Sequence, residues 1–526
     1  MSELASATGG KKHYPNGLDM GEGNLRFPQI ITVSTDAGRA WFARGWMHML
    51  NYNHEEAAEC FKTCTEVDPR CAMAFWGIGN TPELNLSFSD AMARLYDKYA
   101  DDLDVAALYS ESLMALNPWA MWVRKDVEAT GEAEIVPVNG STLIVKDVLE
   151  RAMELPGGME HPGILHLYCH LMELSDDPIA AMPAADTLRN NFRHAGHLTH
   201  MASHIDIWAG HYKAQAALDT NFTAIAADEA TVEHTGVETS FYKGYRIHNV
   251  HMAVWAAMFT GQQDVAMEMA RKLSAMLSPG DENSGIQFML QGLIPMAIFW
   301  EPYTLVKWHA MIRFGLWDEI IAEPRDEDPA LYPTSLTTAH YARGIAFASK
   351  GLVAEAEKEQ AKYLEGMKNP ALGGRMIHNN LIVSDEAPCL FKVGEAMLAG
   401  EIEYRKGNFE TAFEHLREAV RLDTSLLYDE PWGWMVPSRH ALGALLLEQD
   451  HIQEATEVFR ADLKMYPSNM WGLLGLSQCL DKAGDPEAVE AKRRYDEASS
   501  TAESKPAATC FCAKVAGATS PTPCPV

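Results

Sequence analysis

Histidines are concentrated in one part of the 526-residue chain. Eleven of the 20 lie between His161 and His251, and nine of these fall in the segments HPGILHLYCHLME, HAGHLTHMASHID and RIHNVH. A neutral imidazole is a ligand for copper, iron, zinc and nickel, and a carboxylate such as Glu173 adds an oxygen donor. We therefore expect transition-metal ions to bind in this part of the chain.

The spacing of these residues places them on one face of each of three helices. Residues three, four or seven positions apart share a helix face, and three sets follow this rule. The sets are His166, His170 and Glu173, then His197, His200 and His204, and finally His248 and His251. Eight donors exceed the four that one tetrahedral ion needs, so the sequence predicts either two metal ions or one ion with outer hydrogen-bonding partners.

Helical hairpins are the elements that must position these helices. The segment WFARGWMHMLNYNHEEAAECFKTCTEVDP places Trp41, Gly45, Ala57, Phe61 and Pro69 at positions 4, 8, 20, 24 and 32 of the tetratricopeptide pattern. Gly and Ala allow two helices to approach closely, the aromatic residues fill the seam, and Pro ends the second helix. This segment strongly resembles the tetratricopeptide repeat. The resemblance implies an all-α fold of helical hairpins that form a curved superhelical array.

Further copies of the pattern follow nearer the C-terminus. Their members are Gly344, Gly351 and Ala356, then Gly400, Gly407, Phe409, Ala412, Leu416 and Ala419, and then Gly443, Ala455, Phe459 and Pro467. We expect an irregular segment over residues 1–25 and a repeat domain over 26–495, with its histidine-rich section at 161–251. The tail at 496–526 is rich in Ser, Thr, Ala and Pro, so it is predicted to be disordered.

The repeat register indicates where the histidines point. With Ala181 at position 20, and Gly210 and Gly261 at position 15, the three sets fall at positions 2, 5, 9 or 12 of three first helices. In tetratricopeptide repeats these positions line the concave groove, so the resemblance implies that all eight donors face one trough. Neighbouring helices pack about 8–10 Å apart, which is close enough for their side chains to share an ion.

Several phrases also resemble a group of tetratricopeptide-repeat-like proteins of bacteria and fungi. They are HPGILHLYCHLME, AGHLTHMASHIDIWAGHY, NYNHEEAAECF, RIHNVHM and YDEPWGWMVPSRHALGALLLEQ. The resemblance covers about residues 30–480 and implies the fold, but it implies no particular reaction. The segment CAMAFWGIGNTPELN departs from the Gly-Pro-Asn turn expected there, which leaves the role of Glu83 open.

The leading hypothesis is a metal-dependent oxidoreductase that uses dioxygen on a small organic substrate, with copper or iron as the metal. Glu173 and Tyr245 are its candidate catalytic residues, and Tyr245 is the one expected to bind substrate or relay a proton. One alternative is a zinc-dependent hydrolase in which Glu173 acts as the base. The other is a scaffold that binds a peptide or protein partner in the repeat groove. His54 is expected to cap a helix, although it and Glu83 stay open as members of the site.

The amino-acid composition excludes some classes of binding partner. With 72 acidic against 43 basic residues, the net charge of −29 argues against binding to nucleic acids or anionic membranes. No window reaches the roughly 18 apolar residues of a membrane span, and the first residues show no apolar secretory signal. Cys60, Cys64 and Cys71 are expected to be reduced core thiols, which favours a cytoplasmic protein. The sequence does not indicate an oligomeric state.

Overall fold

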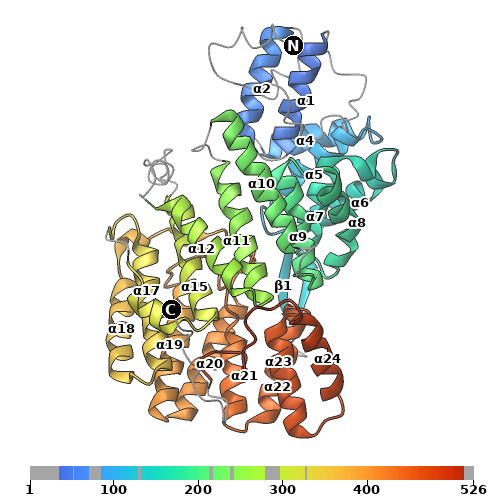
Figure 1. The fold of residues 1–526 in the computed structure, drawn as a ribbon. Helices are drawn as coiled ribbons and strands as arrows, with labels where there is room; N and C mark the ends of the chain where they lie inside the picture. The colour runs from blue at the N-terminus through green and yellow to red at the C-terminus, as the bar shows by residue number, and fades with distance from the viewer. Residues whose placement is uncertain are drawn as a thin grey trace. The chain divides into compact units, whose positions relative to one another are not determined.

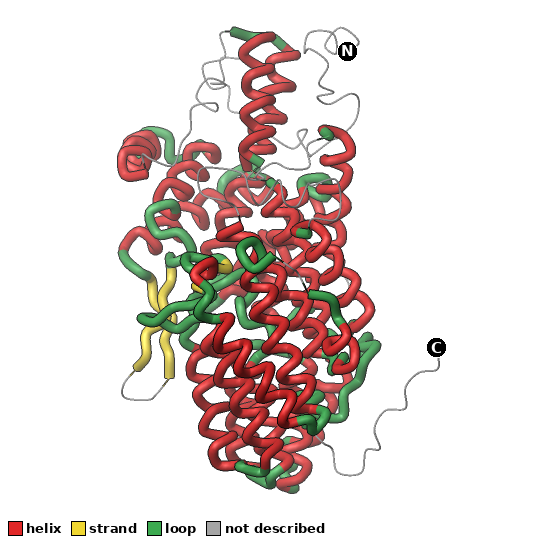
Figure 2. Tube along the Cα trace, turned by 90° about the vertical axis from the view of Figure 1, so that its left-hand side faces the viewer, coloured by secondary structure: helices red, strands yellow, loops and turns green. Residues whose placement is uncertain are grey.

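The regular structure of this chain is nearly all helical. The computed structural model describes residues 35–50, 53–69, 85–127, 132–212, 217–236, 242–278, 297–325 and 328–513, and helices dominate these residues (Figure 2). Two short antiparallel hairpins, β1 with β2 and β3 with β4, are the strands of the described part. The all-α prediction is therefore confirmed.

The chain divides into two compact units. Unit 1 comprises Met1–Ala209 and Ala214–Asn249, and unit 2 comprises Gly210–Lys213 and Val250–Val526. None of the helices in the described residues is both long and apolar enough to cross a membrane.

Unit 1 is built from helices that pack in sequence order, such as α1 with α2 and α9 with α10. Its α-helices are α1 (Asp36–Leu50), α2 (His54–Val67), α4 (Asn85–Tyr96), α5 (Leu103–Met114), α6 (Gly140–Glu154), α7 (Pro162–Met172), α8 (Met182–Asn191), α9 (Gly196–Ala209) and α10 (Ala217–Thr235). The strands β1 (Trp122–Val127) and β2 (Glu132–Pro137) and the short turns η4 (Gly158–Glu160) and η5 (Pro178–Ala181) connect them. Helix α11 (Lys243–Phe259) begins in unit 1 and ends in unit 2.

Unit 2 is a series of helical hairpins. Figure 1 shows α19 to α24 side by side in colours from yellow to red, and consecutive helices of this series contact one another. The elements after α11 are α12 (Gln263–Leu277), α14 (Ala297–Trp300), η6 (Glu301–Thr304), α15 (Leu305–Arg313), α16 (Trp317–Ala322), α17 (Pro333–Ser349), α18 (Val353–Gly366), η7 (Pro370–Leu372), β3 (Met376–Ile377), β4 (Asn380–Leu381), α19 (Leu390–Lys406), α20 (Phe409–Thr424), α21 (Ser438–Glu448), α22 (Ile452–Met465), α23 (Met470–Ala483) and α24 (Ala488–Ala498).

The glycines of the repeat pattern pack as their positions predict. A Cβ atom added to Gly45 would lie 2.7 Å from the Phe61 ring, and one added to Gly443 would lie 2.5 Å from Cζ of Phe459. In both hairpins the glycine of position 8 therefore provides room for the residue of position 24. Gly351 and Gly407, both at position 15, have φ values of 78° and 85°, which a glycine adopts without strain at the turn between two helices.

The C-terminal segment differs from the sequence-based expectation. Residues 496–526 were expected to be disordered, but α24 continues to Ala498 and the chain packs on unit 2 as far as residue 513. The prediction of disorder from composition was wrong here because this segment does not need a core of its own. Helices of unit 2 bind its backbone instead. Residues 514–526 and 1–25 lie outside the described residues.

Other expectations are resolved in part. Helix α2 begins at His54, but its N-cap residue is Asn53, so the expected capping role of His54 is not confirmed. The structure does not describe the His54 side chain. Glu83 and Cys71 lie outside the described residues. Cys60 and Cys64 are buried in the core of unit 1, as predicted.

The packing of Gly443 against Phe459 gives a test of the repeat register. We expect Gly443→Ala to lower the free energy of unfolding of unit 2 by about 1–3 kcal/mol, because the new methyl group overpacks a fully buried ring. Gly140→Ala is the matched control, since nothing lies within 4 Å of its added Cβ and its φ is not positive. The control should be neutral or stabilising by up to about 1 kcal/mol. Urea unfolding followed by circular dichroism measures both; equal effects would contradict the register.

Candidate metal centre

Three alternate helices carry the histidines, as the repeat register predicts. Helices α7, α9 and α11 hold them, and α8, α10 and α12 follow as the second helices of the three hairpins. The start of α7 is fixed locally: Nδ1 of His161 accepts a hydrogen bond from the Ile164 amide at 3.2 Å, and Pro162 occupies the first turn, where no amide donor is needed. His161 is therefore a helix cap.

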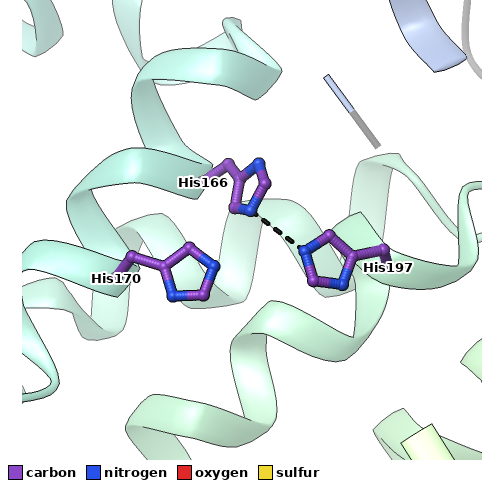
Figure 3. Close-up of side chains that lie close together, drawn as sticks. All are labelled: His166, His170 and His197. Carbon is purple, nitrogen blue, oxygen red and sulfur yellow. Dashed lines mark hydrogen bonds between the residues drawn. The ribbon is translucent and has the colours of Figure 1, made fainter. Parts of the chain in front are cut away.

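The first triad consists of His166 and His170 on α7 and His197 on α9. Their ligand nitrogens lie within 4.8 Å of one another, and Figure 3 shows the three rings turned toward a common space. Nε2 of His166 lies 3.2 Å from Nε2 of His197. His166 and His197 are buried, whereas the His170 side chain is 17% exposed.

The second triad consists of His200 and His204 on α9 and His248 on α11. Its ligand nitrogens also lie within 4.8 Å of one another, and all three residues are buried. Nε2 of His204 lies 2.8 Å from Nε2 of His200 and 3.5 Å from Nε2 of His248. The second triad thus repeats the arrangement of the first, with the same nitrogen atom of each ring turned inward.

The two triads adjoin. The rings of His170 and His204 have centroids 5.3 Å apart, and those of His197 and His200 lie 5.8 Å apart. Helix α9 contributes to both triads because His197 and His200 are one step of three residues apart. The six imidazoles therefore form one continuous cluster inside unit 1 that offers two neighbouring three-nitrogen sites.

Hydrogen-bond partners behind three of these rings determine which ring nitrogen carries the proton. The buried Glu173 carboxylate accepts a hydrogen bond from Nδ1 of His170 at 2.8 Å and another from Nδ1 of His204 at 2.5 Å. The Asn221 amide nitrogen donates to the carbonyl of Ala217, so its oxygen faces Nδ1 of His200, which donates to it at 2.7 Å. With the proton held on Nδ1, each Nε2 directs a lone pair inward.

Burial favours the neutral form of two rings of the cluster, those of His197 and His200. It lowers the pKa of His197 and of His200 well below the usual range, and neighbouring histidines lower both further. Burial by itself would raise the pKa of Glu173, but the charge of His204 and the hydrogen bonds from the two histidines lower it overall. The site therefore combines imidazoles, two of which burial favours in the neutral form, with one carboxylate anion behind them, and a carboxylate in this place is usual behind histidine metal ligands.

The donor set fits metal ions. Two nitrogens bound at about 2.0–2.1 Å to one tetrahedral ion lie roughly 3.3 Å apart. The Nε2 separations of 3.2 Å in the first triad and 3.5 Å in the second agree with that value, and the 2.8 Å pair is somewhat closer. Inward lone pairs of His200 and His204 repel one another unless a proton or a cation lies between them.

The remaining predicted residues fall in different places. The half-buried Tyr245 lies edge-on to His197, with ring centroids 4.8 Å apart, so it borders the first triad. His251 joins neither triad: its Nε2 lies 3.3 Å from Sδ of Met435, and its ring contacts Tyr303.

Sequence reasoning missed two polar residues of α10. Asn221 holds His200, and the buried Asp228 accepts hydrogen bonds from the Tyr242 hydroxyl at 2.9 Å and from the Asn249 amide at 2.7 Å. Burial raises the pKa of Asp228 to about 7. Asn221 and Asp228 are seven positions apart on the buried face of α10, and that spacing is a signal that could have identified them.

Comparisons with known proteins agree on the architecture. A tetratricopeptide repeat family model matches residues 38–71, which span α1 and α2. No curated protein matches the chain.

Three solved structures are similar over most of the chain. The Cut9–Hcn1 hetero-tetramer of APC/C is 14% identical over 88% of this chain and 74% of that one, with a TM-score of 0.31. The human IFIT1 dimer with m7Gppp-AAAA is 11% identical over 93% and 95%, with a TM-score of 0.29. Naa15/Naa10 bound to HypK-THB is 11% identical over 88% and 65%, with a TM-score of 0.22. At these TM-scores the similarities carry no argument about the fold or the function of this chain.

The shared carboxylate gives a test of the site. We expect Glu173→Gln to weaken metal binding about 10–100-fold, because the amide keeps the size of the side chain but loses the charge that favours both Nδ1–H donors. Glu154→Gln, an exposed change in the same unit, is the control and should leave affinity unchanged. Competition titration with a chromophoric chelator measures the affinity. Equal affinities of the two variants would show that Glu173 does not support the site.

Proposed function

The chain is a tetratricopeptide-like helical-repeat protein, and we propose that its unit 1 holds two copper ions, one in each histidine triad, which activate dioxygen for the oxidation of a small organic substrate. The fold supplies only the scaffold, so the argument rests on the site. The observation that carries it is the pair of adjoining triads, in which six imidazoles are packed against one another with Nε2 atoms inward.

The donor set favours copper over the other metals. Mononuclear oxygen-activating iron sites use two histidines and a carboxylate as ligands. Here both oxygens of Glu173 already accept hydrogen bonds from His170 and His204, so the inward-facing donors are nitrogens. Copper has the highest affinity of the divalent first-row metals for such a site, and its reduced form is compatible with three neutral ligands. The carboxylate then acts as an outer partner that orients two ligands, one in each triad.

The half-buried residues at the edge of the histidine cluster suggest where a substrate would bind. The two histidine triads would hold the ions, which would couple the two-electron oxidation of a substrate, with loss of two hydrogens, to the reduction of dioxygen to hydrogen peroxide. His170 and Tyr245 are half-buried, whereas the other five histidines of the cluster are buried. A small aromatic or otherwise planar substrate would pack against the Tyr245 ring, which lies 4.8 Å from the ring of His197.

A second candidate function, binding of a protein partner, is favoured by one observation in unit 2. Side chains on the inner helices of that unit bind the backbone of a segment that has no regular secondary structure. Recognition of a main chain by side chains is how a groove holds a peptide.

Metal content and oxygen consumption test the copper centre together. Protein loaded anaerobically with cuprous ion and desalted should retain about two copper ions per chain, from one ion for each three-nitrogen triad. His166→Ala and His200→Ala should each lose about one ion, and both should lower dioxygen uptake with phenolic substrates at least about 100-fold, since both ions are needed. Elemental analysis and an oxygen electrode provide the measurements.

The exposed His194 provides the control, because His194→Ala removes an imidazole of the same unit that belongs to neither triad. Its copper content and oxygen uptake should equal those of the unchanged protein. Retention of two copper ions by both triad variants would refute the ligand assignment. Two bound ions without any oxygen uptake would refute the oxidase function but not the metal centre.

A further inference from the structure

The segment after α24 returns across the helices of unit 2. In Figure 1 the dark red chain leaves α24 and runs back over α23 and α21. Its start is tied to α12: the amides of Glu503 and Ser504 donate to the carbonyl of Gly261 at 3.1 and 3.0 Å, and the Glu503 carboxylate accepts from the Asp264 amide at 2.9 Å. These hydrogen bonds therefore fix the position of the first residues of the segment on unit 2.

Side chains of three different helices bind the backbone of this segment. Gln478 on α23 donates to the carbonyl of Ala507 at 2.7 Å, and Arg313 on α15 donates to that of Thr509 at 3.4 Å. Arg405 on α19 donates to the carbonyl of Cys512. Because these contacts involve main-chain atoms, they hold a peptide without depending on its sequence.

Two side chains of the segment add contacts that do depend on sequence. The Thr509 hydroxyl donates to the carbonyl of His440 at 2.7 Å, and Thr509 is 1% exposed. The Phe511 ring lies against Gly315, where an added Cβ would come within 2.7 Å of it, and its centroid is 6.2 Å from that of Trp471. The absence of a side chain at residue 315 thus makes room for an aromatic residue of the segment.

The donors of the groove are held in place by unit 2 itself. The Arg313 guanidinium stacks over the Trp471 ring at 4.2 Å and donates to Nδ1 of His440 at 2.9 Å. The Arg405 guanidinium pairs with Glu401 at 2.6 Å. These arginines therefore need little further ordering when a peptide binds, which is the condition for favourable recognition.

The segment fills most of the space that it covers. A cavity of about 40 Å³ remains between residues 509–512 and the inner faces of α15, α17, α19 and α21. Such a volume holds little more than a water molecule or two. A second peptide therefore cannot bind in this place unless the segment leaves.

We propose that the inner face of unit 2 is a peptide-binding groove whose resident ligand is the chain's own segment 503–513. A partner protein binds there by displacing this segment with an extended peptide that carries a hydroxyl residue and, two positions later, an aromatic residue, as Thr509 and Phe511 do. The proposal rests on the second candidate function given above and is independent of the metal centre.

Tethering makes the segment an effective competitor. A ligand joined to its site by a short chain acts at an effective concentration of about millimolar, so a free peptide with the same contacts is excluded until it exceeds that concentration. Weakening the contacts of the resident segment should therefore open the groove to a free peptide. The groove itself remains unchanged, because its arginines are held by other helices.

The experiment uses the full-length chain and a fluorescent synthetic peptide of residues 500–515 with Cys510 and Cys512 joined by a disulfide, as in the structure. Thr509→Val combined with Phe511→Ala in the protein should raise its affinity for the peptide at least about tenfold over that of the unchanged protein. Fluorescence anisotropy measures the binding. Lys505→Ala, an exposed change in the same segment, is the control and should bind the peptide as weakly as the unchanged protein does.

The outcomes separate the groove from its occupant. A peptide that carries Thr509→Val and Phe511→Ala should not bind the protein variant with the same two substitutions. This loss would show that the free peptide uses the contacts that Thr509 and Phe511 make in the structure. If the unchanged protein and the Thr509→Val, Phe511→Ala variant bound the peptide with equal affinity, the groove would remain a peptide site. The proposal that segment 503–513 occupies and blocks it would be refuted. No binding to the opened protein, with its circular dichroism unchanged, would overturn both. A concentration-dependent dimer that Phe511→Ala abolishes would show that the segment binds a second copy instead.

Discussion

The candidate metal centre depends on one buried carboxylate that two helices share. Glu173, at the end of α7, accepts hydrogen bonds from His170 on its own helix and from His204 on α9. Breaking either contact would leave charge or a polar donor unsatisfied in the interior, so the carboxylate fixes how α7 and α9 are aligned along their axes. That alignment brings His166 opposite His197 and determines which nitrogen of each ring faces inward.

The helical spacing of the histidines predicts most of the candidate site, and it was wrong for one of them. Repeat spacing correctly predicted that α7, α9 and α11 are the first helices of three hairpins and that six of the seven proposed histidines cluster. His251 was included because it lies three residues after His248 and takes position 5 of the register, but its ring contacts Met435 and Tyr303 instead. Asn221 was missed for another reason. It lies on a second helix, and positional rules for the groove consider only first helices.

The fold was predictable where the pattern fixes a packing contact. A glycine of position 8 next to an aromatic residue of position 24 is such a contact, and Gly45 with Phe61 and Gly443 with Phe459 confirm it. Composition was a poor guide to the C-terminal segment, because low hydrophobicity shows only that a segment cannot form its own core. It does not exclude binding to another surface, and the carbonyls of Ala507 and Thr509 are bound by side chains 29 and 196 residues away in sequence.

Folding alone gives no reason to bury six imidazoles with their nitrogens facing one another. An apolar core packs a repeat array at least as well. In the second triad, Glu173 and Asn221 accept hydrogen bonds from the outer nitrogens of His204 and His200, whose inner nitrogens lie 2.8 Å apart. A cation bound between such lone pairs converts their repulsion into ligation. A bound cation would therefore stabilise this arrangement, and that is the physical basis of the metal centre proposed for unit 1.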